Sequence, residues 1–96
     1  MAAIGVLTLE LRLEDSHSLK EKRHVVESLK TRLRNKFNVS VAEVQHNDKW
    51  QLAGIGICAV ANDAHHAREV VEHAVDYIEQ LRLDVEIIEE ETELLD

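Results

Sequence analysis

The chain has 96 residues, of which 45% are hydrophobic and 31% charged, and its formal net charge is −8. This length suits one domain and excludes two, and a single cysteine, Cys58, excludes an internal disulfide and a cysteine-based metal site. The N-terminal residues do not resemble a signal peptide, and no apolar run reaches a membrane-spanning length. We therefore expect a cytoplasmic protein with no membrane partner.

The first predicted elements are a strand and a helix. Residues 4–13 predict a strand with one buried face, because leucine occupies every second position at Leu7, Leu9, Leu11 and Leu13. Asp15–His17 interrupts the strand. Ser18 with Glu21 fits a capping box and begins a helix. Apolar residues then recur at helical spacing, at Leu19, Val26, Leu29, Leu33 and Phe37.

The second half of the chain predicts a hairpin, a helix and a last strand. Residues 38–45 and 51–61 form two strands around the polar stretch HNDK. Asn62 or Asp63 caps a helix whose apolar stripe is Ala67, Val71, Ala74, Ile78 and Leu81. Residues 83–89 (LDVEIIE) alternate as a strand, and the acidic residues 91–96 are expected to fray.

This order of elements, β-α-β-β-α-β, predicts one α+β domain over residues 1–96 with a ferredoxin-like fold. A four-stranded antiparallel sheet would carry both helices on one face. The leucine face of the first strand would lie beneath them.

Positive charge is concentrated in the first predicted helix. Residues 18–36 hold seven bases and two acids, Glu21 and Glu27. Lys20, Lys22 and Arg23 lie in the first turns, where the helix dipole disfavours cations. With His17, Ser18 and the free backbone N–H groups, they make a candidate phosphate pocket. Lys30 and Arg34 continue one flank of the helix. The alternative interpretation is a solvated helix face whose bases balance acids elsewhere.

Trp50, near the end of the hairpin, is a candidate for stacking on a base or anchoring a partner, or else folds over the sheet edge. The two central strands carry no aromatic ring, which excludes base stacking in the manner of RNA-recognition motifs. Any RNA contact would therefore reach the backbone phosphates. We expect no DNA partner.

Catalytic and metal-binding patterns are absent from the sequence. His65, Glu69 and His73 share one face of the second helix, but their spacing is not that of zinc enzymes, and a solvated face is favoured. No phosphate loop or catalytic triad pattern occurs. We expect no enzyme activity, no catalytic residue, no metal and no cofactor.

An alternative function uses the sheet face opposite the helices. Its predicted side chains are semi-apolar: Val6, Thr8, Gly56, Cys58, Val60 and Ile88. An uncovered apolar face favours a homodimer or another protein-interaction module. The acidic C-terminal residues could meet a basic surface of a partner.

Four stretches together resemble the bacterial YlxP family: HSLKEKR at 17–23, FNVSVAEV at 37–44, HNDKWQ at 46–51 and AND at 61–63. The resemblance implies a ferredoxin-like, cytoplasmic bacterial protein of unknown function. It also implies a role near the ribosome, because members are often encoded beside translation initiation and ribosome-maturation factors. The first hypothesis is thus a ribosome- or RNA-associated binding module, with His17, Ser18, Lys20, Lys22, Arg23, Lys30, Arg34 and Trp50 as its surface.

Overall fold

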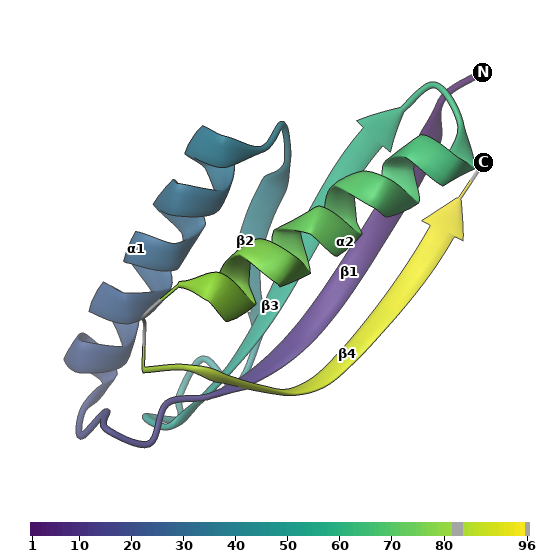
Figure 1. Cartoon of the computed structure of the whole chain (residues 1–96). Helices are drawn as coiled ribbons and strands as arrows, with labels where there is room; N and C mark the ends of the chain where they lie inside the picture. The colour runs from purple at the N-terminus through teal and green to yellow at the C-terminus, as the bar shows by residue number, and fades with distance from the viewer. Residues whose placement is uncertain (82–83, 96) are drawn as a thin grey trace.

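One antiparallel sheet, with strand order β2-β3-β1-β4, carries two helices on one face (Figure 1). The computed structural model describes residues 1–81 and 84–95. The elements are β1 (Ala3–Arg12), α1 (Leu19–Lys36), β2 (Ser40–Gln45), β3 (Leu52–Ala61), α2 (Ala64–Gln80) and β4 (Glu86–Leu95). The predicted α+β, ferredoxin-like arrangement is confirmed.

The core lies between the sheet and the helices, and the leucine face of β1 is its centre. Leu7, Leu9, Leu11 and Leu13 are at most 2% exposed. Isoleucines of β3 extend this layer, and it packs against Val26, Leu29 and Leu33 of α1 and Val71, Ala74 and Ile78 of α2. Alternation along β1 buries every second residue because successive side chains of a strand point to opposite faces.

Both helices begin at the predicted caps. The backbone N–H of Glu21 donates to Ser18 Oγ at 3.1 Å, and Asp63, rather than Asn62, accepts from the N–H of His66 at 2.8 Å. Glu21 Oε2 in turn accepts from the N–H of His17 at 2.7 Å. The start of α1 is therefore held by side chains of its own first turn.

The C-terminal strand is longer than predicted. Residues 91–95 belong to β4 and pair with β1 as far as Leu95 opposite Ile4, so the expectation of a frayed end is corrected there. The reason is that β1 is ten residues long, and the backbone N–H and C=O groups on the edge that β3 does not cover need partners, which β4 provides. Arg82, Leu83 and Asp96 lie outside the described residues, and with them the predicted start of this strand and the last residue of the predicted tail.

A β-bulge interrupts β4 near its start. Glu10 lies opposite Glu89 while Leu11 lies opposite Ile87, so Ile88 is the extra residue. Ile88, predicted to face away from the helices with Val60, is half-buried in this bulge. From Glu89 to Leu95, β4 pairs with β1 in unbroken register. In the described part of the chain, no helix is long and apolar enough to cross a membrane.

Candidate functional site

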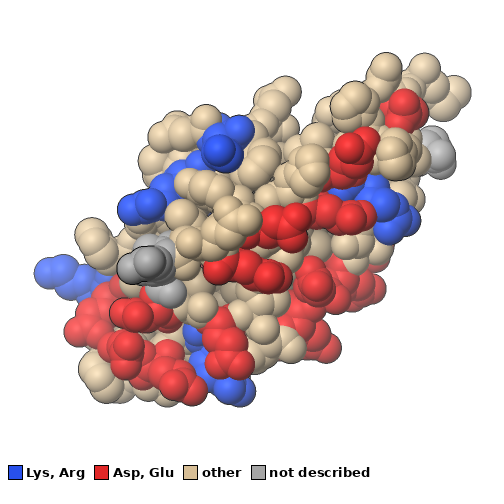
Figure 2. Space-filling view, in the orientation of Figure 1, with Lys and Arg blue, Asp and Glu red and all other residues tan. Residues whose placement is uncertain are grey.

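The basic residues of α1 divide between two flanks and the core. At about 100° per residue, Lys20, Arg23, Lys30 and Arg34 fall along one flank, with Glu27 among them. We call these four residues the basic flank. Lys20, Arg23 and Arg34 are exposed, and Lys30 is half-buried. Figure 2 shows blue side chains along α1, and red side chains over α2 and β4 and around the lower end of α1, where the helix begins.

Two members of the basic flank are already engaged. Lys30 Nζ lies 3.2 Å from Glu27 Oε1, in an ion pair whose glutamate is 64% exposed. Arg34 Nη2 donates to the carbonyl of Val41 at 2.8 Å. Lys20 and Arg23 form no ion pair or side-chain hydrogen bond with the residues that the structure describes. These two are the cations of the flank most available to a ligand.

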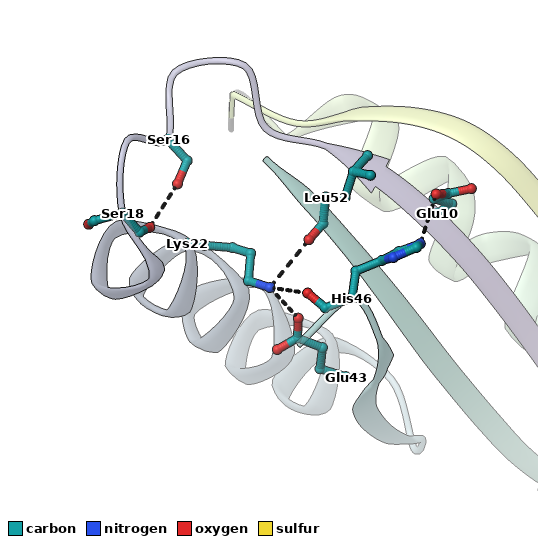
Figure 3. Close-up of polar contacts among 7 residues, drawn as sticks. All are labelled: Glu10, Ser16, Ser18, Lys22, Glu43, His46 and Leu52. Atoms are coloured by element: carbon teal, nitrogen blue, oxygen red, sulfur yellow. Dashed lines mark hydrogen bonds and ion pairs between the residues drawn. The ribbon is translucent and has the colours of Figure 1, made fainter. Parts of the chain in front are cut away.

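Lys22 is not part of this surface. Its side chain is completely buried, with Nζ 2.8 Å from Glu43 Oε2 in an ion pair (Figure 3). Nζ also donates to the carbonyls of His46 at 2.6 Å and Leu52 at 3.3 Å. The prediction that Lys22 contacts the phosphate of a ligand is therefore wrong, because its only anionic partner among the described residues is Glu43. Position 22 falls within the buried stripe of α1 with Val26 and Leu29, and three acceptors compensate its charge there.

The Lys22 ammonium is the centre of a cluster that joins α1 to the β2–β3 hairpin. Glu43 comes from β2, and its Oε2 is the carboxylate oxygen that lies 2.8 Å from the Lys22 ammonium. His46 has a φ of 61°, a left-handed conformation that turns the chain at the hairpin. Its ring points away from Lys22 toward Glu10 of β1, and its Nε2 lies 2.9 Å from Glu10 Oε1 (Figure 3).

Gln51 holds the loop before α1 in place. Its Nε2 donates to the carbonyls of Glu14 and Ser16, each at 3.2 Å. Ser16 Oγ donates to the carbonyl of Ser18, also at 3.2 Å. Five polar residues of the HSLKEKR and HNDKWQ stretches therefore have side-chain partners within the protein: Ser18, Glu21, Lys22, His46 and Gln51. The sequence indicated neither these long-range pairs nor the Glu10–His46 contact.

The backbone at the start of α1 is less open to an anion than predicted. Ser18 Oγ serves as the cap, and the Glu21 carboxylate already accepts from His17 N–H. A phosphate there would have to displace a carboxylate, so the Ser18 and His17 part of the predicted pocket is occupied. The side chain of His17 is exposed. The candidate contact therefore moves from the helix end to the side chains of Lys20 and Arg23.

Lys20 and Arg23 border one hollow of about 680 Å³ beside the first turns of α1. Leu13 and Val25 are among its apolar lining residues, and Asp84 is one of its acids. This mixture of charges disfavours a free anion in the hollow itself. Lys20 and Arg23 line this hollow together with the acids Asp15, Glu21, Glu27 and Asp84, and both remain exposed to solvent.

Trp50 is 53% exposed in the hairpin between β2 and β3. It borders a shallow hollow with Asp48, Lys49 and Gln51, so more than half of its surface is open to a ligand. The carbonyl oxygen of Leu52, two residues later, accepts a hydrogen bond from Lys22 Nζ. Trp50 therefore lies at the same end of the molecule as the start of α1.

The sheet face opposite the helices is apolar at the end that carries both termini and as far as the middle of the sheet. Ile4 lies opposite Val60 on one side and Leu95 on the other, and Val60 and Leu95 are 64% and 53% exposed. Val6, Thr8, Gly56 and Cys58 continue this face and are half-buried, and Val44 beside Gly56 is 52% exposed. At the other end, an acidic hollow is lined by Thr8, Glu10, Gln45, Glu89, Glu90 and Glu91.

The histidines of α2 are solvent-facing. His65 Nε2 lies 3.1 Å from Glu69 Oε1, and the two side chains are 83% and 47% exposed. Within residues 1–81 and 84–95, no group of three or more histidine, cysteine, aspartate and glutamate side chains is placed to hold a metal ion.

Comparison with known proteins gives a family but no activity. Residues 4–92 match the profile of a family described as "Protein of unknown function (DUF503)". The chain is 37% identical over 76 residues to the "Uncharacterized protein YlxP" of Bacillus subtilis (strain 168), covering 79% of this chain and 83% of that protein. The resemblance to the YlxP family is thereby confirmed.

Among solved structures, the de novo designed protein Foldit4 superimposes with a TM-score of 0.57 at 12% identity, over 100% of this chain and 98% of that one. This similarity concerns the fold alone. LarC2, the C-terminal domain of a cyclometallase, gives a TM-score of 0.41 at 13% identity, over 96% of this chain and 55% of that one. That score is too low to bear on function.

Proposed function

The chain belongs to the DUF503 family of proteins of unknown function, and we propose that it is a non-enzymatic cytoplasmic binding module. In this proposal, the basic flank of α1 contacts the phosphates of a structured RNA, such as that of the ribosome. The observation that supports this is the pair Lys20 and Arg23, which are exposed, adjacent on one flank and without ion-pair partners among the described residues.

The charge distribution favours a local contact over general RNA binding. The protein as a whole is acidic, at −8, and acidic side chains gather over α2 and β4 (Figure 2). These would repel a polyanion, and α1, which holds seven of the eleven lysines and arginines, is the element best suited to approach phosphates. Such contacts orient the protein without reading a base sequence.

Lys30 and Arg34 extend the contact along α1. The partner of Lys30 is an exposed carboxylate, which a phosphate could replace at small cost because exposed ion pairs contribute little. Arg34 uses one guanidinium nitrogen for the Val41 carbonyl and keeps further N–H donors for a ligand. Trp50, exposed at the same end, supplies an aromatic face on which an unpaired base could stack.

Co-sedimentation with purified bacterial ribosomal subunits at low salt tests this proposal. We compare the wild type with Lys20→Glu/Arg23→Glu. The matched control is Arg32→Glu/Lys36→Glu, which makes the same change of charge on the opposite flank of the same helix. We expect the first variant to bind about tenfold or more weakly and the control to bind nearly as well as the wild type.

Two results would contradict the proposal. Equal losses in both double variants would show that net charge, rather than the basic flank, determines association. Absence of binding by the folded wild-type protein at low salt would remove the ribosome as the partner.

A second candidate function, homodimerisation, is favoured by the apolar end of the open sheet face. Val60, Ile4 and Leu95 form an adjacent row across three strands, and two of them are more than half exposed. A two-fold interface would bury this row against its copy. Sedimentation equilibrium of the wild type and Val60→Asp would show a dimer that the substitution dissociates. A wild-type monomer at high concentration would exclude this function.

A further inference from the structure

Among residues 1–81 and 84–95, the outer edge of β4 is the longer of the two sheet edges. β4 is an edge strand of ten residues, and from Glu89 to Leu95 it pairs with β1 in unbroken register on its other side. Alternate residues of such an edge direct unpaired N–H and C=O groups outward. A strand that offers a regular row of donors and acceptors can be extended by one more strand.

The other edge of the sheet, β2, is less accessible. It has six residues, and its register shifts between Glu43 and Gln45. Arg34 also covers it from α1 by donating to the Val41 carbonyl at 2.8 Å. A bulge and a side-chain donor at the edge are devices that prevent strand addition. Among the described residues, no bulge and no side-chain donor of this kind interrupts the outer edge of β4 from Glu89 to Leu95.

Acidic side chains flank the β4 edge on both faces of the sheet. Glu89, Glu91 and Glu93 lie opposite Glu10, Thr8 and Val6, on the face away from the helices. Glu90 lies opposite Leu9, on the helix side. There it shares a hollow with the α2 residues Glu72, Asp76 and Glu79.

These charges are largely uncompensated within the protein. Arg12 pairs with Glu86 at 3.8 Å and Arg68 with Glu72 at 3.9 Å. Among the described residues, no ion pair involves the four glutamates of the regular stretch, Glu89, Glu90, Glu91 and Glu93. The edge is therefore bordered by negative charge above and below. A second copy's β4 would be repelled, because like charges would meet on both faces.

We propose that the outer edge of β4 binds an extended lysine- and arginine-rich segment of a partner protein by strand addition. Side chains of an added strand alternate between the two faces. Basic residues on one face would reach Glu91 and Glu93, and those on the other would reach Glu90 and the acids of α2. Main-chain hydrogen bonds provide the binding, and the two acidic faces select a basic sequence. This proposal does not depend on RNA contact by α1.

The test uses the full chain and a capped eight-residue peptide, Lys-Lys-Val-Lys-Lys-Val-Lys-Lys, which carries lysine on both faces when extended. The matched peptide is N-methylated at every internal residue, so it keeps the charge but loses the main-chain N–H donors of all residues except the two at its ends. Amide hydrogen exchange is followed by nuclear magnetic resonance at about 0.15 M salt. We expect the first peptide to slow exchange of outward-facing amides in residues 89–95 at least tenfold, and the methylated peptide to leave them unchanged.

Equal effects of the two peptides would show non-specific charge attraction and overturn the proposal, as would no effect of either. In titrations, Glu91→Lys/Glu93→Lys should weaken binding of the first peptide at least tenfold. Glu27→Lys/Asp48→Lys changes the charge equally on the α1 and hairpin side, and should weaken it less than threefold. Similar losses in both variants would also overturn the proposal.

Discussion

Replacing Lys22 with methionine should destabilise the fold more than any single substitution at the protein surface. The substitution keeps the length of the apolar part of the side chain and removes the ammonium that contacts Glu43, His46 and Leu52. Glu43, whose side chain is 14% exposed, would then be a nearly buried carboxylate without a cation. Removing one partner of a buried ion pair costs about 3–5 kcal/mol.

That loss is large beside the total stability of a domain of this size. Stabilities of about 0.05–0.15 kcal/mol per residue are typical, so Lys22→Met should consume much of the free energy of unfolding. With a urea m-value of about 1.5 kcal/mol per M, the midpoint of unfolding should fall by about 2–3 M. Urea unfolding monitored by circular dichroism measures this shift. Lys20→Met, an exposed neighbour on the same helix, is the control and should change stability by less than about 0.5 kcal/mol.

A double variant separates the cost of leaving the Glu43 carboxylate without a cation from the cost of removing the lysine itself. Lys22→Met/Glu43→Leu removes both charges and should recover part of the stability, because no buried carboxylate then remains. The carbonyls of His46 and Leu52 would still lack their donor, so recovery should be incomplete. A loss below about 1 kcal/mol for Lys22→Met would refute the reasoning. It would mean that the ammonium is solvated in solution and available to ligands.

Three further substitutions test the fold, each by urea unfolding. Leu29→Ala removes a fully buried side chain of α1 and should cost about 2–5 kcal/mol; a cost near zero would contradict the packing of α1 on the sheet. Gly5→Ala would place a Cβ 2.9 Å from the Ala67 carbonyl oxygen of α2 and should cost about 1–3 kcal/mol, whereas unchanged stability would mean that α2 lies farther from β1. Ser18→Ala removes the α1 cap and should cost about 0.5–2 kcal/mol, with Ser28→Ala in mid-helix as a control that should not destabilise.

The fold could be predicted from the sequence wherever a pattern has one physical meaning. The alternating leucines of β1 and the Ser18–Glu21 capping box identified their elements because burial and capping act locally. The full length of β4 could not be found in this way. Residues 89–91 are all glutamate, so polar and apolar residues do not alternate there. The strand continues because these residues pair with β1.

The candidate site was less predictable because its residues interact over long stretches of sequence. The helical wheel places Lys22 on the apolar stripe of α1, yet a lysine there was interpreted as a surface cation. Its partners come from β2, the hairpin and β3, and nothing local marks Glu43 or the His46 carbonyl as acceptors. Lys20 and Arg23, whose environment is mostly solvent, were placed correctly at the surface by the same wheel.

The salt dependence of binding to purified ribosomal subunits tests the phosphate contact most directly. For each phosphate that a cation neutralises on structured RNA, the slope of log K against log salt concentration changes by about 0.7–0.9. If Lys20 and Arg23 each contact a phosphate, Lys20→Gln/Arg23→Gln should bind more weakly and reduce the magnitude of the slope by about 1.4–1.8. A slope equal to that of the wild type would contradict the assignment of the basic flank of α1 as the phosphate-contacting surface.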